Sequence, residues 1–165
     1  MTEQQPTPTK GLRSVELDAT GLTVALVCAR FNDDITGRLE GGARSALVEQ
    51  GANDADVHTV WVPGALEVPV VANAMARSGR YDAVVGIGAV VRGETYHFEV
   101  VSNESAAGLM RVALDTGVVV TNGIITVDNM AQALDRVGGA HGHKGADAAL
   151  AAVETLQAIR AVLPR

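Results

Sequence analysis

A short segment near the middle of the chain combines residue types that bind phosphate and move protons. Arg92-Gly93-Glu94-Thr95 places a cation, a glycine and a hydroxyl where an apolar strand is expected to give way to a helix. The first backbone N–H groups of a helix are free to bind an anion. His97 follows two residues later, and the ordinary pKa of a histidine, about 6.5, suits proton transfer at neutral pH. The segment indicates a phosphate site beside a proton-transfer group, although His97 could instead cap or pack against its helix.

Three other loop segments carry charged or aromatic residues that could contact a ligand. Phe31 lies just past the end of an expected strand, where its ring either covers the core or stacks on a flat ligand. Glu67 stands at the start of a helix, so its carboxylate either complements the helix dipole or accepts hydrogen bonds from ligand hydroxyls. Arg136 and Lys144 flank a glycine-rich link, as solvated cations or as part of an anion site. Each residue has a structural alternative, but together the four regions favour a ligand site.

Apolar segments alternate with amphipathic ones along the chain, and this alternation predicts the elements that position these residues. The expected strands cover residues 22–28, 57–62, 82–91 and 118–126. The expected helices cover residues 33–51, 64–79, 92–117, 129–137 and 146–162. Strands joined through helices predict right-handed crossovers and a three-layer α/β fold, a parallel sheet with helices on both faces. Ligands of such sheets bind outside the carboxyl ends of the strands.

Length and composition limit the classes of function. A chain of 165 residues predicts one domain, which we expect to cover residues 12–165 after a polar, flexible arm at residues 1–11. A net charge of −6 and 3% aromatic residues disfavour nucleic acid as a partner. The sequence has neither an apolar run of membrane-spanning length nor the pattern of a secretory signal, so we expect a cytoplasmic protein without a membrane partner.

Several familiar site patterns fail on inspection. Gly86 and Gly88 lack the third glycine of a dinucleotide fingerprint and lie inside an expected strand, and no phosphate-binding P-loop pattern is complete. His141 and His143 have no cysteine or carboxylate at a supporting spacing, which favours a solvated loop over a metal site. Cys28 is the single cysteine and is expected to be an inert buried thiol in a reducing compartment. These observations disfavour a dinucleotide site, a P-loop and a metal site.

Five segments carry a resemblance to a known family. ARFND, PGALEVP, GAVVRGETYHFE, NGIITVDNMAQALDR and HKGADAA, in this order and spacing, resemble the signature segments of the 6,7-dimethyl-8-ribityllumazine synthase family. The resemblance spans residues 22–156 and implies a flavodoxin-like α/β subunit. It also implies a transferase of riboflavin biosynthesis that joins 5-amino-6-ribitylamino-uracil to 3,4-dihydroxy-2-butanone 4-phosphate and releases phosphate and water. The resemblance implies that neither a metal nor a redox cofactor is used.

The resemblance implies a role for particular residues in binding the pyrimidine substrate. Phe31 would stack on the pyrimidine ring. The backbone of Ala65 and the carboxylate of Glu67 would hold the ribityl chain. Val90 and Val91 would present backbone groups to the heterocycle.

The resemblance also implies which residues meet the phosphate and the reacting atoms. Gly93, Glu94 and Thr95 would lie at the phosphate, with Glu94 contributing its N–H because its carboxylate would repel the anion. His97 would be the proton-transfer residue. A neighbouring subunit would supply three more site residues: Asn122, Arg136 and Lys144.

A binding module that holds a lumazine or flavin without turnover is the competing class. Such a module needs no general acid beside an anion site, so His97 together with Thr95 and Arg136 favours the enzyme. A purified protein that is yellow and inert with both substrates would indicate the module instead.

Assembly into a homo-oligomer of pentamers is a further implication of the resemblance. In the family, an insertion in the link between the last two helices accompanies pentamers that stay free, and the link VGGAHGH at residues 137–143 lacks one. That favours a sixty-subunit shell. In shells the N-terminal arm adds a strand to a neighbour's sheet, a role weakened by Pro6 and Pro8, which cannot donate hydrogen bonds, although residues 12–17 could still pair.

Overall fold

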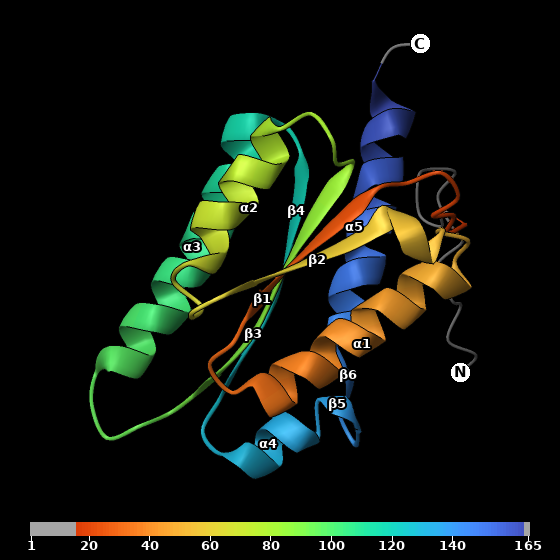
Figure 1. The fold of residues 1–165 in the computed structure, drawn as a ribbon. Coiled ribbons are helices and arrows are strands. Elements are labelled where there is room, and N and C mark those ends of the chain that lie inside the picture. Colours follow the sequence, from red (N-terminus) through yellow and green to blue (C-terminus); the bar gives the residue numbers. More distant parts are fainter. Residues whose placement is uncertain (1–15, 164–165) are drawn as a thin grey trace, which may run out of the picture.

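A four-stranded parallel sheet forms the centre of the computed structural model, which describes residues 16–163 (Figure 1). The strands run in the order β2-β1-β3-β4, and every neighbouring pair is parallel. Their bounds are β1 Val24–Ala29, β2 Val57–Val62, β3 Ala83–Val91 and β4 Val119–Val127. All four lie within two residues of the prediction. The predicted arm at residues 1–11 lies outside the described residues.

Helices cover both faces of this sheet, which confirms the predicted three-layer α/β class. One face is covered by α1 (Asp33–Glu49) and α5 (Lys144–Val162), and the other by α2 (Val68–Arg77) and α3 (His97–Thr116), as Figure 1 shows. A short helix α4 (Met130–Leu134) and a turn η1 (Asp54–Asp56) lie outside these layers.

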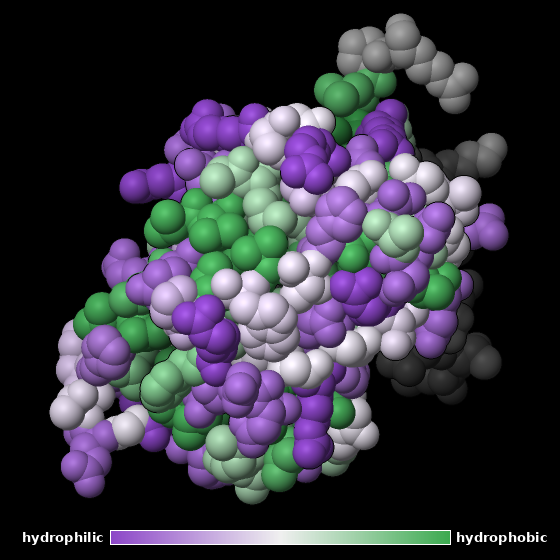
Figure 2. All heavy atoms as spheres, in the orientation of Figure 1, coloured by the Kyte–Doolittle hydropathy of each residue, from purple (hydrophilic) through white to green (hydrophobic). Residues whose placement is uncertain are grey.

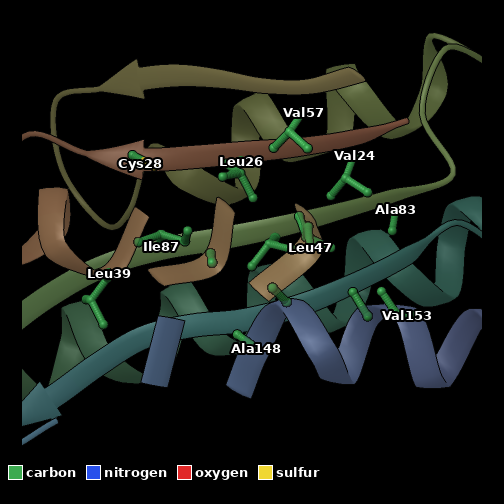
Figure 3. Packing of buried hydrophobic residues seen from close by; sticks show 14 of the residues in the cluster. Val24, Leu26, Cys28, Leu39, Leu47, Val57, Ala83, Ile87, Ala148 and Val153 are labelled. Carbon is green, nitrogen blue, oxygen red and sulfur yellow. The ribbon is translucent and has the colours of Figure 1, made fainter. Parts of the chain in front are cut away.

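The core is divided by the sheet into two hydrophobic clusters. All six residues of β1 are buried, and their side chains alternate between the α1/α5 cluster (Val24, Leu26, Cys28) and the α2/α3 cluster (Ala25, Val27, Ala29). A strand covered on both faces needs apolar residues at every position, which explains why LTVALVC shows no polar alternation. Figure 3 shows Leu26 and Ile87 of the sheet with Val153 of α5 in the first cluster.

Three helix starts differ from the prediction. Residues 64–67 form turns and α2 begins at Val68, so that Pro69, which has no backbone N–H, falls in the first turn. Residues 92–96 are likewise outside α3, which begins at His97. The last helix begins at Lys144, two residues earlier than expected.

The link between the last two helices is an antiparallel hairpin that the sequence did not predict. Strands β5 (Val137–Gly139) and β6 (Gly142–His143) pair after α4 has ended at Leu134, three residues before the expected end. The expectation of a solvated loop is wrong for His143, which is half-buried and accepts a hydrogen bond at Nδ1 from the Ala146 N–H (3.3 Å), capping α5. His141 does remain exposed.

A glycine sets the close approach of α1 and α5. A Cβ added at Gly145 would lie 2.0 Å from the backbone oxygen of Leu39. We expect Gly145→Ala to lower the free energy of unfolding by about 1–3 kcal/mol, because the backbone of α1 or α5 must move to accept the methyl group. Gly41→Ala, in the middle of α1 with no atom within 4 Å of the new Cβ, is the control and should be neutral or gain up to about 1 kcal/mol. Urea unfolding midpoints measure both; equal midpoints would contradict the close approach.

The predicted burial of the single cysteine is confirmed. Cys28 is fully buried, and burial, reinforced by the negative charge of Glu40, raises the pKa of its thiol to about 12. Because the thiolate is the reactive form, we expect iodoacetamide at pH 8 to leave Cys28 unmodified in the native protein and to alkylate it in urea. Mass spectrometry measures the added mass. Rapid alkylation without denaturant would contradict the described position of Cys28.

Candidate active site

A cavity of about 580 Å³ opens at the carboxyl ends of β1 and β3. Its walls come from the end of β1 and Phe31, two residues later, the loop that follows β2, the last residues of β3, the turn at residues 93–95, and the first residues of α3. Parallel strands bring their carboxyl ends to one edge of the sheet, so loops far apart in sequence meet there. The cavity therefore lies where the strand order predicts a ligand site.

Eight of the twelve predicted site residues line this cavity. They are Phe31, Ala65, Glu67, Val90, Val91, Gly93, Thr95 and His97. Glu94 lies in the same turn without lining the cavity. Asn122 and Lys144 line a separate depression of about 390 Å³ along β4 and α5, and Arg136 lines neither. A single chain thus brings together the residues that the resemblance assigns to the same subunit, those for the pyrimidine and part of those for the phosphate. The three residues assigned to a neighbouring subunit lie elsewhere.

Phe31 lies at the mouth of the cavity, and the alternative that its ring covers the core is wrong. The residue is 73% exposed. Its N–H donates to the Pro63 oxygen (3.2 Å), and the next residue, Asn32, has a left-handed backbone with φ 60°. The Asn32 side chain also donates to the Ala89 oxygen on β3 (2.9 Å). The sequence did not indicate a role for Asn32. Asparagine is among the few non-glycine residues that tolerate this conformation, and its side chain attaches the Phe31 loop to β3.

The carboxylate of Glu67 is available at the cavity wall. Glu67 is the residue before α2, yet its side chain makes no capping hydrogen bond with the helix. Instead it lies over Gly64, where an added Cβ would be 3.1 Å from the Glu67 Oε2. Its oxygens can therefore accept hydrogen bonds from ligand hydroxyls.

His97 is the first residue of α3 and is exposed toward the cavity. Its backbone N–H donates to the Thr95 Oγ1 (3.4 Å), so the hydroxyl, rather than the imidazole, supports the helix start. Within residues 16–163 the His97 ring forms no hydrogen bond or ion pair. The imidazole is free to exchange a proton with a ligand.

The cation of the 92–95 segment points away from the cavity. The Arg92 guanidinium donates to Asp128 through Nε (2.8 Å) and to Glu99 through Nη1, and it stacks 4.2 Å from the centre of the Phe98 ring. These hydrogen bonds raise the pKa of Arg92, and the bond from Arg92 lowers the pKa of the Glu99 carboxyl. The cavity lining contains neither lysine nor arginine, and Glu67 and His97 are its titratable members.

Within residues 16–163, no group of three or more histidine, cysteine, aspartate or glutamate side chains is arranged to hold a metal ion. Among the helices formed by these residues, none is long and apolar enough to cross a membrane.

A comparison with protein families identifies the chain. The family model described as 6,7-dimethyl-8-ribityllumazine synthase matches residues 21–160. The chain belongs to this family. The resemblance of the five sequence segments is thereby confirmed, and with it the class: a transferase of riboflavin biosynthesis. Its reaction condenses 5-amino-6-ribitylamino-uracil with 3,4-dihydroxy-2-butanone 4-phosphate to give 6,7-dimethyl-8-ribityllumazine. The flavin-binding module is set aside in favour of the enzyme.

Proposed function

We propose that the cavity between β1, β3 and α3 is where the two substrates of lumazine synthesis are joined. The observation that carries this proposal is that eight family-implied residues, from the ends of three strands and the segments that follow them, line one cavity. Its volume, about 580 Å³, is within the usual range for small-molecule sites.

The free edge of β3 supports the proposed position of the pyrimidine. β3 pairs with β1 only as far as Ile87, whereas its pairing with β4 continues to Val91. The backbone beside the cavity therefore has no strand partner on its β1 side, and a planar heterocycle with its own donors and acceptors can take that place. We assign the edge at Val90 and Val91 to the pyrimidine, the Phe31 ring to its face, and Glu67 with the Ala65 backbone to the ribityl chain.

The chemistry requires positioning more than activation. The attacking group is the 5-amino nitrogen of the pyrimidine substrate, so the enzyme needs no nucleophile of its own. Attack on the ketone carbonyl forms a Schiff base and releases water, and holding both reactants in one cavity accelerates this step. Loss of the proton on C3 and of phosphate from C4 then leaves an enol, which tautomerises to a new carbonyl at C3. The ribityl-substituted nitrogen closes the ring onto this carbonyl with loss of a second water. We assign the proton transfers of elimination and ring closure to His97.

The charge of the cavity supports a contribution from a second subunit. A phosphate at the turn 93–95 would meet backbone N–H groups and the Thr95 hydroxyl, but no lysine or arginine of the cavity lining. Phosphate sites in proteins commonly add such a cation. We therefore propose that Arg136 and Lys144 of a neighbouring copy, with Asn122 toward the pyrimidine, complete the site.

Exposed apolar side chains support the same conclusion. Val70 on α2 and Met110 and Leu114 on α3 are 68%, 61% and 77% exposed. Figure 2 shows hydrophobic residues gathered over this side of the molecule. We propose that α2 and α3 contribute to a subunit interface of a cyclic pentamer. The short hairpin at residues 137–143 favours further closure into a sixty-subunit shell.

Two substitutions separate the proposed roles in turnover. With both substrates and no added metal, His97→Ala should lower kcat by about 10²–10⁴-fold and leave the affinity for a lumazine-like ligand nearly unchanged. Arg136→Ala should chiefly raise KM for the phosphorylated ketone, because it binds the anion in the ground state. Steady-state kinetics, followed by lumazine absorbance, measure both effects.

His58→Ala is the matched control for the histidine variant. His58 lies near the start of β2, at the end of the sheet opposite the cavity, and bonds to Tyr81. Its removal should leave kcat and both KM values within about twofold of the parent. Identical kinetic changes in His97→Ala and Arg136→Ala would refute the division of roles, and absence of product from the assembled parent protein would refute the site.

Sedimentation velocity at neutral pH tests the assembly. We expect a species near sixty subunit masses, since the hairpin link has no insertion that would keep pentamers apart. A species near five subunit masses with nothing larger would refute the shell and leave the pentameric site in place. A monomer that turns over both substrates would refute the shared site.

A further inference from the structure

The turn between β3 and α3 is weakly attached to the rest of the chain. Residues 93–96 are exposed, and an added Cβ at Gly93 would meet no atom within 4 Å. Among the described residues, no backbone hydrogen bond joins Gly93, Glu94 or Thr95 to another segment. This turn carries the N–H groups assigned above to the phosphate and leads directly into His97. Something other than its own backbone must set its position.

Arg92 connects both ends of this turn to the sheet. Its N–H donates to the Val127 oxygen (2.8 Å), which continues the β3–β4 ladder. Its side chain reaches Asp128, which follows β4, and Glu99 in the first turn of α3, and its guanidinium lies over the Phe98 ring. The guanidinium of the residue before the turn thus joins the first turn of α3, which follows the turn, to the segment after β4.

The segment after β4 is itself held in place. The Asp128 N–H donates to the Gln132 Oε1 (2.8 Å) on α4. The Asn129 side chain in turn accepts from the Gln132 N–H (2.9 Å) at the start of that helix. Asp128 is therefore a fixed point for Arg92 rather than a mobile loop carboxylate.

The charges of this group exclude a direct role in phosphate binding. One guanidinium faces two carboxylates, so the three side chains carry a net charge of −1, and Arg92 does not line the cavity. The pKa of Glu99 is lowered, so its bond to Arg92 is present at neutral pH and is lost only as the pH falls through that lowered value.

We propose that Arg92 is a positioning residue for the condensation: with Asp128, Glu99 and Phe98 it forms a clamp that holds the 93–96 turn and His97 in place. The inference rests on the proposed function, which assigns this turn to the phosphate. The clamp reduces the backbone entropy that phosphate binding would otherwise have to remove. Arginine suits this role because the planar guanidinium donates to two carboxylates from Nε and Nη1 while its face stacks on a ring, whereas an ammonium group is a compact point charge without a planar face.

Kinetics of the full-length protein with both substrates test the clamp. Arg92→Gln should raise KM for the phosphorylated ketone about tenfold, since re-ordering a single backbone residue costs a factor of this order. KM for the pyrimidine should change less than about threefold. Arg92→Lys should resemble Arg92→Gln, because charge alone does not restore the clamp. Full rescue by lysine would overturn the proposal.

The direction of the change in KM for the ketone in Asp128→Asn distinguishes the clamp from direct phosphate binding by Arg92. If Arg92 bound the phosphate directly, removing a competing carboxylate would lower KM for the ketone. The clamp predicts the opposite, a rise of several fold, and the double variant Arg92→Gln/Asp128→Asn should be little worse than either single variant. A lowered KM in Asp128→Asn overturns the proposal. This isosteric variant also carries the test if Arg92→Gln does not fold.

Arg44→Gln is the matched control, since Arg44 likewise bonds two carboxylates, Glu40 and Asp54, away from the cavity. It should leave both KM values unchanged; a rise in ketone KM like that of Arg92→Gln would overturn a specific clamp. Thr95→Val reports on the turn itself. If KM for the ketone rises in Thr95→Val but not in the Arg92 variants, the clamp alone is refuted. If it rises in neither, the phosphate assignment on which the clamp rests is refuted.

Discussion

Every position of β1 is buried, and its side chains alternate between two hydrophobic clusters on opposite faces of the sheet. Burial on both faces requires helices in both outer layers, and helical crossovers make all the strands parallel. Parallel strands then collect the loops after β1, β2 and β3 at one edge. The cavity, with Phe31, Glu67 and His97 on three different loops or helix starts, follows from this burial.

The charged side chains at the edge of the cavity are bonded to one another and are separate from the groups that line it. Arg92, Glu99 and Asp128 lie beside the 93–96 turn, but they bond to one another and so link the ends of β3 and β4 to α3. The lining itself offers backbone groups, a hydroxyl, one imidazole and one carboxylate. Such a lining suits a sugar-like chain and a heterocycle better than a dianion, which agrees with the proposal that cations from a neighbouring copy complete the phosphate site.

Periodicity and apolar runs predicted the strands to within two residues, because β-branched residues in an unbroken apolar run fit a strand buried on both faces. The β5–β6 hairpin was not predicted, because strands of three and two residues that are rich in glycine show no alternation of apolar and polar side chains. The exposure of Phe31 depends on a bond between Asn32 and Ala89, and the direction of Arg92 depends on Asp128. The first pair is separated by 57 positions in the sequence and the second by 36, and contacts over such separations leave no local pattern.

The hairpin between α4 and α5 is anchored at both of its ends. Arg136 donates from Nη1 to the Gln132 oxygen (2.9 Å), while His143 caps α5 with its ring against Gly42. Neither anchor can shift without disturbing a helix, and a side chain at Gly139 would collide with Asp135. Natural or engineered length changes can therefore be accommodated at the exposed tip, between Ala140 and His141. An insertion there would alter the shape this surface offers to other molecules while leaving the subunit's own fold intact.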